Sequence, residues 1–327
     1  MSAPTEVKPG KILSPNGVIV PTREFARKLL EGKAVDGRVS PYVSQDHEVQ
    51  VVKAAIRVGL PIALCGSHGM GKTTLIANIA KGTGLPMVTV MGDKVRAAQL
   101  LGEERDFPDG SIEWKSGLVD IVVRANYGIL FIDEFVNMRA DALTSISNLL
   151  DDRKKIALRE TGEELDALDV VLVAAFNPPP SDMRVSLPTP ATFDRFVMWK
   201  WGVADPVGTL LKMYDAIKAG NTSGIKVDRM SPDEVLDKEP YIAKKHGAAL
   251  GEIVKAINSE ATRIMLTPYK DLEDPVRAIR NAIRLIVGGL EPRLAAMAAL
   301  VYPMNPVKGQ EIAEFETAAS KLIDTKI

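Results

Sequence analysis

The sequence predicts an α/β fold in which a parallel β-sheet, with helices on both faces, is followed by a smaller all-helical domain. Three observations predict it. A glycine-rich loop at residues 66–73 lies between a short apolar run and a run with helical spacing. Short apolar runs then alternate with helical segments as far as residue 200. Beyond that point strand-like runs cease while helical periodicity continues. Such alternation is typical of parallel sheets, whose strands are buried on both faces.

The spacing of apolar residues predicts the individual elements. Short runs that are continuously apolar or β-branched predict strands at 60–65, 87–91, 128–133, 170–176 and 196–200. Helical spacing predicts helices at 46–58, 74–81, 118–125 and 140–150.

Two segments interrupt this alternation and are predicted to form hairpins. Residues 107–114 contain the turn signal Pro-Asp-Gly, and residues 155–168 turn at 160–163. From the spacing alone, decoration of the surface is the simpler interpretation of both hairpins.

Composition changes divide the chain into three parts. Residues 1–40 are rich in Pro, Gly and charge, with one amphipathic stretch at 22–30, and we interpret them as an N-terminal extension or short docking helix. Residues 41–204 hold the predicted sheet, with both hairpins inserted in it. Residues 205–327 are predicted to form the helical domain, their helices broken by several prolines.

Composition also narrows the class of protein. Among 327 residues, 41 Lys and Arg balance 42 Asp and Glu, which argues against a strongly electrostatic nucleic-acid binder. The single cysteine, Cys65, cannot form an internal disulfide and suits a reducing compartment. No apolar run approaches the length of a membrane span, and the N-terminus does not resemble a signal peptide. We therefore expect a soluble, cytoplasmic protein. The three histidines lack the spacing of metal ligands.

The glycine-rich loop fits the phosphate-binding pattern G-x-x-x-x-G-K-[ST]. Its glycines let backbone N–H groups converge on phosphates at the start of a helix, whose positive end attracts them. We expect Lys72 to reach the β- and γ-phosphates and the hydroxyl of Thr73 to hold Mg²⁺. The residues assigned to the nucleotide are Gly66, Ser67, His68, Gly69, Met70, Gly71, Lys72, Thr73 and Thr74.

Polar side chains follow two later strands. Asp133 and Glu134 end an apolar strand, where Asp133 could hold Mg²⁺ through water and Glu134 could act as the general base. A pair of solvated strand-end carboxylates is the simpler alternative. Asn177 ends the next predicted strand and could bind the attacking water or the γ-phosphate. Its alternative role is to cap the turn at 178–180.

Two arginines are candidates for binding phosphate charge. Arg195 precedes the last predicted strand, and its permanent charge suits a transition-state phosphate, although an ion pair with Asp194 is equally compatible. Pro292 fits the first position of a helix, which places Arg293 in the first turn of that helix. A solvent-facing arginine is the simpler interpretation of Arg293.

Together these motifs resemble the MoxR family of AAA+ ATPases, most closely its CbbQ/NorQ-like branch. The resemblance covers about residues 45–300. The matching segments are Gly66–Thr73 (Walker A), Ile129–Glu134 (Walker B), Asn177 (sensor 1), Phe193–Phe196 (arginine finger) and Gly289–Arg293 (sensor 2). Residues 109–118 also resemble the segment that precedes Walker B in this branch.

The resemblance implies a P-loop NTPase αβα domain with a helical lid. It also implies assembly into a ring, usually a hexamer, in which ATP and Mg²⁺ bind at the subunit interfaces. Residues of the two Walker motifs and Asn177 would act in cis, Arg195 would reach in from a neighbour, and Arg293 would move with the lid. The two hairpins would be the helix-2 insert and the pre-sensor-1 hairpin, which contact substrate proteins. Family members often remodel or activate a protein client together with a von Willebrand factor A-domain protein.

Two details bear on the arginines. Glu291 stands where the family commonly has a small residue, and its charge weakens the positive field of Arg293. Arg139 lies near a family arginine that follows Walker B, so it is a second candidate for the arginine that acts in trans.

Other functions remain open on the sequence alone. A small-molecule P-loop kinase would usually carry lid arginines and an acceptor site, and it would not need Arg293. A ring that nucleotide stabilises, with little hydrolysis, would serve as a scaffold. A DNA-remodelling motor is disfavoured by the net charge, and a GTPase by the absence of an Asn-Lys-x-Asp signature. The sequence does not identify a client protein.

Overall fold

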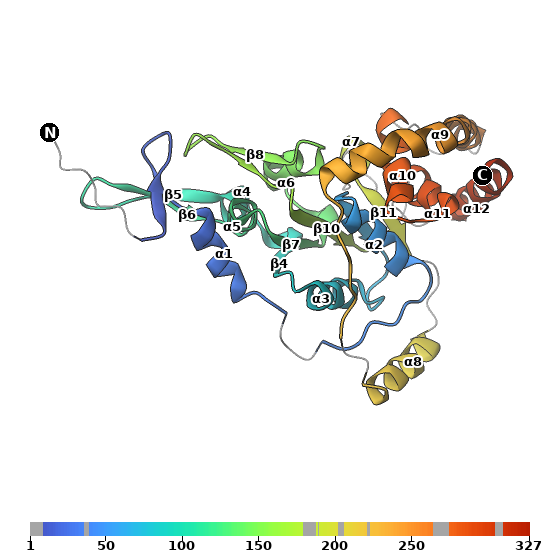
Figure 1. Cartoon of the computed structure of the whole chain (residues 1–327), viewed down its shortest axis with the longest axis horizontal. Helices are drawn as coiled ribbons and strands as arrows, with labels where there is room; N and C mark the ends of the chain where they lie inside the picture. Colours follow the sequence, from blue (N-terminus) through green and yellow to red (C-terminus); the bar gives the residue numbers. More distant parts are fainter. Residues whose placement is uncertain are drawn as a thin grey trace. The chain divides into compact units, whose positions relative to one another are not determined.

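The structure is a computed structural model that describes residues 9–35, 39–178, 188, 190–201, 206–220, 223–263, 275–304 and 310–327 (Figure 1). The chain divides into two compact units. Unit 1 comprises residues 1–37 and 84–172, and unit 2 comprises residues 38–83 and 173–327. The boundary falls within one strand, β10 (Val170–Phe176).

Unit 2 contains a parallel sheet with the strand order β11-β3-β10. Ile62 in β3 (Ile62–Cys65) is in register with Val173 in β10 and with Val197 in β11 (Val197–Lys200). All four residues of β3 are buried, as expected for a strand covered on both faces. Helix α2 (Glu48–Arg57) precedes β3, and α3 (Lys72–Thr83) follows the glycine-rich loop. The predicted parallel sheet is confirmed.

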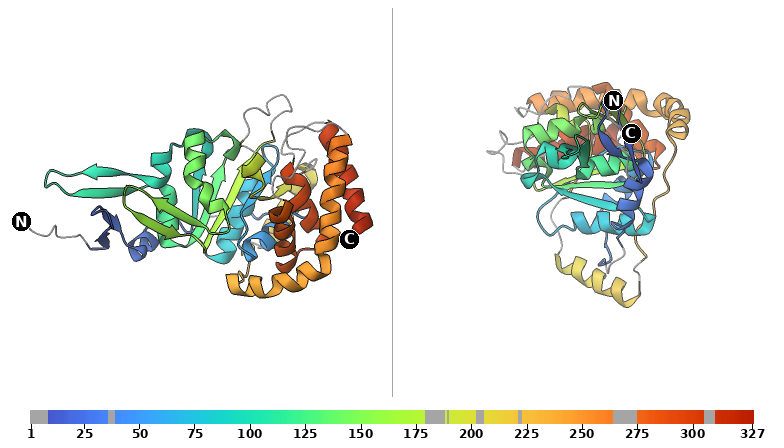
Figure 2. Two further views of the ribbon diagram at one scale, coloured as in Figure 1. Left: turned by 90° about the horizontal axis from the view of Figure 1, so that it is seen from above. Right: turned by 90° about the vertical axis from the view of Figure 1, so that its left-hand side faces the viewer.

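The rest of unit 2, as far as the structure describes it, consists of helices joined by turns and loops. The orange and red helices in Figure 2 belong to this region, and α9 packs against both α10 and α12. The elements are α7 (Pro190–Phe193), α8 (Pro206–Lys218), α9 (Pro232–Arg263), α10 (Pro275–Val287), α11 (Pro292–Ala296), a π-helical turn (Met297–Val301), a 3₁₀ turn (Tyr302–Met304) and α12 (Gln310–Lys326). No helix of the described residues is long and apolar enough to cross a membrane.

Prolines in this region begin helices more often than they break them. Pro206, Pro232, Pro275 and Pro292 each occupy the first position of a helix, where the missing N–H costs nothing and the fixed φ is already helical. Pro240 lies inside α9. The first four therefore stand at boundaries between helices, as predicted, whereas Pro240 does not end its helix. A sixth predicted break, Pro268, lies outside the described residues.

Unit 1 contains the remaining parallel strands, in the order β10-β7-β4. Met87 in β4 (Met87–Met91) is in register with Ile129 in β7 (Gly128–Asp133). Helix α5 (Leu118–Ala125) matches its predicted bounds. The predicted helix at 140–150 is instead α6 (Ala140–Ile146) followed by a 3₁₀ turn (Ser147–Leu150). Shorter elements are a 3₁₀ turn (Gly92–Lys94), α4 (Ala97–Leu101) and a 3₁₀ turn (Phe135–Asn137).

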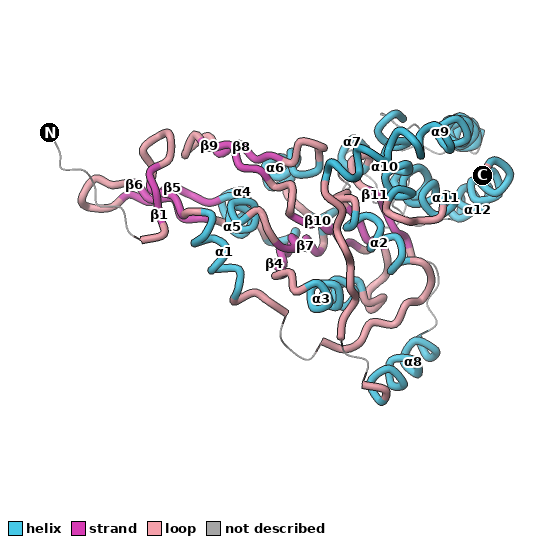
Figure 3. The backbone as a smooth tube through the Cα atoms, in the orientation of Figure 1, coloured by secondary structure: helices cyan, strands magenta, loops and turns pink. Residues whose placement is uncertain are grey.

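The N-terminal segment is more than an extension with one helix. Besides α1 (Arg23–Glu31), it forms β1 (Lys11–Leu13) and β2 (Ile19–Pro21), and β2 pairs in parallel with β6 (Ile112–Ser116). The first predicted hairpin, β5 (Gly102–Asp106) with β6, thereby becomes part of a four-stranded sheet of order β1-β2-β6-β5 (Figure 3). Residues 1–8 and 36–38 of the predicted extension lie outside the described residues.

The N-terminal segment also binds the second hairpin, β8 (Lys155–Leu158) with β9 (Glu163–Asp166). In the β1–β2 turn, the Asn16 amide donates hydrogen bonds of 3.0 Å to the carbonyls of Arg159 and Glu160. The Asn16 backbone N–H donates to the carbonyl of Thr161 over 3.2 Å. Residues 11–21 therefore contact both hairpins.

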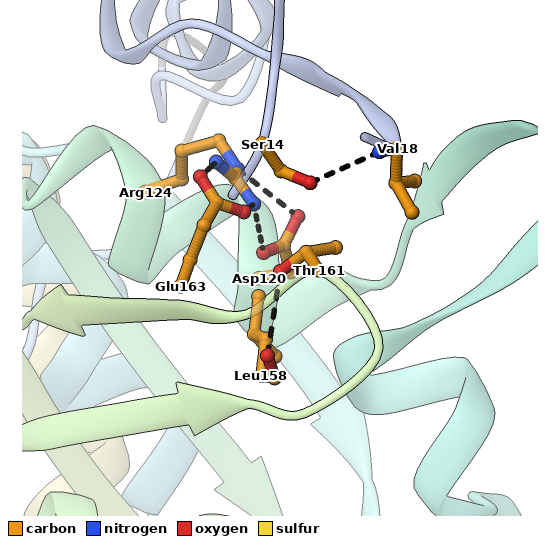
Figure 4. Close-up of polar contacts among 7 residues, drawn as sticks. All are labelled: Ser14, Val18, Asp120, Arg124, Leu158, Thr161 and Glu163. Carbon is orange, nitrogen blue, oxygen red and sulfur yellow. Dashed lines mark hydrogen bonds and ion pairs between the residues drawn. The ribbon is translucent and has the colours of Figure 1, made fainter. Parts of the chain in front are cut away.

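A buried charge cluster connects β9 to α5 (Figure 4). The Arg124 guanidinium donates two hydrogen bonds of 2.8 Å to Glu163 and two, of 3.2 and 3.5 Å, to Asp120, and its side chain is 4% exposed. Burial raises the pKa of Asp120 despite the nearby guanidinium. Burial alone would also raise the pKa of Glu163, but the hydrogen bonds and charge of Arg124 lower it. The cluster therefore holds two carboxylates that depend on one cation.

Replacing Arg124 by Met is expected to lower the free energy of unfolding by about 3–5 kcal/mol, because it leaves buried carboxylates without their cation. Urea unfolding followed by circular dichroism measures this loss. Combining Arg124→Met with Asp120→Asn is expected to recover part of it, since that removes the most buried charge. Lys155→Met, in an exposed ion pair on the same hairpin, is the control and should change little. Equal stability of the Arg124→Met and Lys155→Met proteins would contradict the structural role of the cluster.

Candidate functional site

The glycine-rich loop connects β3 to the first turn of α3. Gly69 and Gly71 have φ of +79° and +83°, a region that L side chains rarely adopt. The Gly66 N–H donates to the carbonyl of Phe176 over 3.1 Å, which ties the start of the loop to the end of β10. A Cβ added at Gly66 would lie 3.1 Å from the Trp201 ring. The loop thus needs glycine both for its backbone conformation and for its close packing.

Lys72 links two motifs that the sequence places more than 100 residues apart. Its side chain is buried, and Nζ donates to the carbonyls of Gly66 over 2.6 Å and of Ser67 over 3.1 Å. Nζ also donates to the Asn177 Oδ1 over 2.9 Å. The structure therefore brings the lysine of the phosphate-binding pattern and the amide at the end of β10 together. Of the hydroxyl residues that follow, Thr73 is exposed and Thr74 is half-buried.

His68 lies on the other side of the Asn177 amide. Its Nε2 and Nδ1 lie 3.0 and 3.4 Å from Asn177 Nδ2. The phosphate-binding pattern includes His68 in the loop without a specific role, because His68 occupies a variable position of the pattern. No sequence signal identifies this contact, since it depends on how the loop and the end of β10 approach each other.

Residues just before α2 and its first residue, Glu48, contact the loop, and no sequence motif predicts these contacts. The fully buried Glu48 carboxylate accepts hydrogen bonds from the Tyr42 hydroxyl over 2.9 Å and from the Gln45 N–H over 2.7 Å. The Gln45 amide donates to the carbonyl of Met70 over 3.2 Å, and the Tyr42 ring lies 3.1 Å from a Cβ added at Gly71. Burial and the neighbouring Glu48 raise the pKa of the Tyr42 hydroxyl, so it stays a neutral donor.

Asp133 and Glu134 belong to unit 1, at the carboxyl end of β7. Asp133 Oδ1 accepts from the Glu134 N–H over 3.0 Å, and Glu134 Oε2 accepts from the Asn137 amide over 3.1 Å. Glu134 has φ of +53°, a left-handed conformation that is unfavourable for most non-glycine residues. Such strain clusters at functional sites and is held there by the surrounding structure. Here a Cβ added at Gly92 would lie only 2.6 Å from the Glu134 carbonyl oxygen.

The three candidate arginines have different surroundings. Arg195 is half-buried between α7 and β11, and its backbone N–H donates to the Thr192 carbonyl over 3.3 Å. Arg139 precedes α6 with a side chain that is 64% exposed, and its Nε donates to Asp141 over 3.1 Å. Exposure leaves the Arg139 side chain room to reorient, whereas the Arg195 side chain is half-buried.

Arg293, the second residue of α11, is bound to α12 instead of facing only solvent. Its Nε donates to Asp324 Oδ1 over 2.6 Å and its Nη2 donates to Ser320 Oγ over 2.8 Å. Contact with a phosphate would require Arg293 to exchange Asp324 for the phosphate. The pair is partly exposed, so this exchange costs little free energy.

Thr73 in unit 2 and Asp133 in unit 1 each carry an oxygen donor of the kind that Mg²⁺ prefers. Mg²⁺ prefers carboxylate, hydroxyl and phosphate oxygens and takes only one or two ligands from the protein. Thr73 offers a hydroxyl on the solvent side of α3, and Asp133 offers a half-buried carboxylate. Within the residues that the structure describes, no group of three or more His, Cys, Asp or Glu forms an all-protein metal site.

Comparison with known proteins gives consistent matches. The family model of the AAA domain (dynein-related subfamily) matches residues 61–196. The denitrification regulatory protein NirQ of Pseudomonas aeruginosa is 31% identical over 268 residues, which cover 81% of this chain and 90% of NirQ. Protein NorQ of Paracoccus denitrificans is 35% identical over 167 residues, 50% of this chain and 61% of NorQ. Protein CbbQ of Hydrogenophilus thermoluteolus is 30% identical over 144 residues, 43% of this chain and 53% of CbbQ.

A solved structure from Cytophaga hutchinsonii has the same fold. It superposes with a TM-score of 0.57 and covers 93% of this chain and 94% of its own, at 19% sequence identity. At this identity the likeness supports the fold and carries no residue roles.

Proposed function

The chain belongs to the MoxR-family AAA+ ATPases, in the branch that includes NirQ, NorQ and CbbQ, and on that premise we propose that it binds and hydrolyses ATP with Mg²⁺ to remodel or activate a protein partner. The observation that carries the proposal is the contact between Lys72 and Asn177. It joins the phosphate-binding loop to the strand-end amide that would sense the γ-phosphate, and a simple anion-binding loop needs no such amide.

Each residue near the phosphates has a proposed role. Lys72 would bind the β- and γ-phosphate oxygens, the Thr73 hydroxyl would hold Mg²⁺, and Asp133 would hold it through water, so that the ion would neutralise phosphate charge. Glu134 accepts the proton of the attacking water. Asn177 donates from its amide to the γ-phosphate or to that water. The remaining loop residues supply backbone N–H groups.

The arginines support assembly into a ring, usually a hexamer in this family, with ATP at the subunit interfaces. We propose that Arg195 stabilises transition-state charge on ATP bound to a neighbouring subunit, with Arg139 as the alternative. Arg293 would act in the helical lid after leaving Asp324. We also propose the division into an extension at 1–40, a nucleotide-binding domain at 41–204 and a lid at 205–327.

Two observations suggest that the partner is a protein: the name of a relative, and the two hairpins of this chain. NirQ is named a denitrification regulatory protein. A regulatory protein can act by binding another protein, and we propose the same for this chain. In this chain β5–β6 and β8–β9, joined by residues 11–21, would contact the client. A von Willebrand factor A-domain protein is proposed as the adaptor, and the cytoplasm as the location.

The assembly state separates the proposal from a monomeric kinase. We expect size-exclusion chromatography with light scattering to give a ring of several subunits in the presence of a slowly hydrolysed ATP analogue, together with ATP hydrolysis that needs no small-molecule acceptor. Lys72→Ala should lose both responses, because nucleotide no longer binds tightly. A protein that stays monomeric with bound analogue would contradict the ring. Assembly without hydrolysis would favour the scaffold.

A further inference from the structure

We propose that Asp324 of α12 competes with the γ-phosphate of ATP for Arg293, and that this competition sets how strongly the protein prefers ATP to ADP. The inference rests on the proposed function, in which Arg293 leaves Asp324 to act on bound ATP. It assigns a specificity-determining role to a residue that no motif of the sequence includes.

Three polar residues of α12 form one row along the helix. Glu316, Ser320 and Asp324 are four residues apart, a spacing that places side chains on one helical face. The neighbouring row is the buried face of the helix and consists of Ile312, Phe315, Ala319 and Ile323. Because α12 packs against α9 and α11, the polar row lies at the border of this packing and can reach neighbouring elements.

One end of the row is fixed to the parallel sheet of unit 2. Lys200, the last residue of β11, is in register with Cys65, which directly precedes the glycine-rich loop. The Lys200 Nζ donates to Glu316 Oε1, and the two side chains are only 11% and 22% exposed. Burial raises the pKa of Glu316 even though the charge of Lys200 acts to lower it. Separating a pair this buried leaves a charge without its partner, so this end of α12 stays in place.

The other end of the row holds Arg293 by contacts that are easier to exchange. Arg293 Nε donates to Asp324 Oδ1 over 2.6 Å, and its Nη2 donates to Ser320 Oγ over 2.8 Å. The side chains of Arg293 and Asp324 are 40% and 51% exposed, and solvent-exposed ion pairs contribute little net free energy. Asp324 also lies in the last turn of α12, where the helix dipole disfavours a negative charge. The guanidinium of Arg293 offsets that cost.

A carboxylate and a phosphate compete for the same guanidinium. Both are anions that accept charge-assisted hydrogen bonds from arginine, so Asp324 and a γ-phosphate cannot both bind the Nε–H of Arg293. ADP has no γ-phosphate and leaves the contact with Asp324 intact. Loss of the Asp324 charge should therefore strengthen the binding of ATP and leave the binding of ADP unchanged.

Calorimetric titration of the full-length protein with ATPγS and with ADP tests this competition. Asp324→Asn removes the charge and keeps the shape of the side chain. It is expected to raise the affinity for ATPγS about two- to fivefold, the range of a partly exposed ion pair, while the affinity for ADP stays unchanged. Asp324→Glu keeps a carboxylate and should bind both nucleotides as the wild-type protein does.

Two controls separate this role from a general effect of charge or of stability. In an Arg293→Ala background, Asp324→Asn should no longer change the affinity for ATPγS. Glu314→Gln makes the same change of charge at an exposed residue of α12 outside the row, and it should leave the preference between the two nucleotides unaltered. An Asp324→Asn protein that binds ATPγS no better, or that keeps its gain without Arg293, would overturn the inference. Wild-type protein that binds ATPγS and does not hydrolyse ATP would contradict the proposed function alone, because these titrations need no turnover.

Discussion

Replacing Arg195 by Ala is expected to reduce ATP hydrolysis by about three to five orders of magnitude while leaving the affinity of a single subunit for ATP largely unchanged. An arginine supplied by a neighbouring subunit acts on charge that develops in the transition state, so its loss affects turnover far more than binding. A coupled phosphate-release assay and titration with a fluorescent ATP analogue measure the two quantities.

The half-buried position of Arg195 makes a fold control necessary. The Arg195→Ala protein should keep the melting temperature and assembly state of the wild type. Arg139→Ala is the matched comparison, because Arg139 is the other candidate and is mostly exposed. A steep loss of hydrolysis in Arg139→Ala with near-normal turnover in Arg195→Ala would transfer the role to Arg139.

Replacing Glu134 by Gln is expected to lower hydrolysis by about two to four orders of magnitude, because the amide cannot accept the proton of the attacking water. ATP binding should persist, since Gln has nearly the same shape and the Asn137 amide can still donate to its carbonyl oxygen. The same two assays apply. Glu24→Gln, on the exposed face of α1, removes a carboxylate elsewhere in unit 1 and should not alter turnover.

Near-normal turnover of the Glu134→Gln protein would show that another group accepts the proton. Loss of ATP binding in this variant would point instead to the strained backbone at Glu134, whose φ of +53° makes the residue sensitive to any change nearby.

The sequence predicted the parallel strands well because they are buried on both faces and therefore read as continuous apolar runs. The strands β4, β7 and β10 have their predicted bounds. It did not predict β1 and β2, because three residues are too few to show an alternating pattern. Contacts between distant segments stabilise these strands. Strand β2 pairs with the edge of β6, and Asn16, between β1 and β2, binds the β8–β9 turn.

Residues of the candidate site were predictable where a motif fixes both residue type and spacing. Lys72 came from the loop pattern and Asn177 from its place after an apolar strand, and the structure joins them. His68 and Glu48 carry no such signal, because their contacts arise from the approach of separate segments. The bond of Arg293 to Asp324 likewise depends on the packing of α12 against α11. The catalytic roles and the domain boundaries stay predictions.

Mixing two inactive variants tests the central claim, that ATP is hydrolysed at an interface between subunits, most directly. Arg195→Ala subunits retain Glu134, and Glu134→Gln subunits retain Arg195, so a mixed ring contains interfaces with both groups intact. Mixing the two proteins in equal amounts is therefore expected to restore a measurable fraction of wild-type ATP hydrolysis, although neither is active alone. Mixed rings that assemble and show no hydrolysis above that of the separate variants would contradict an arginine that acts in trans.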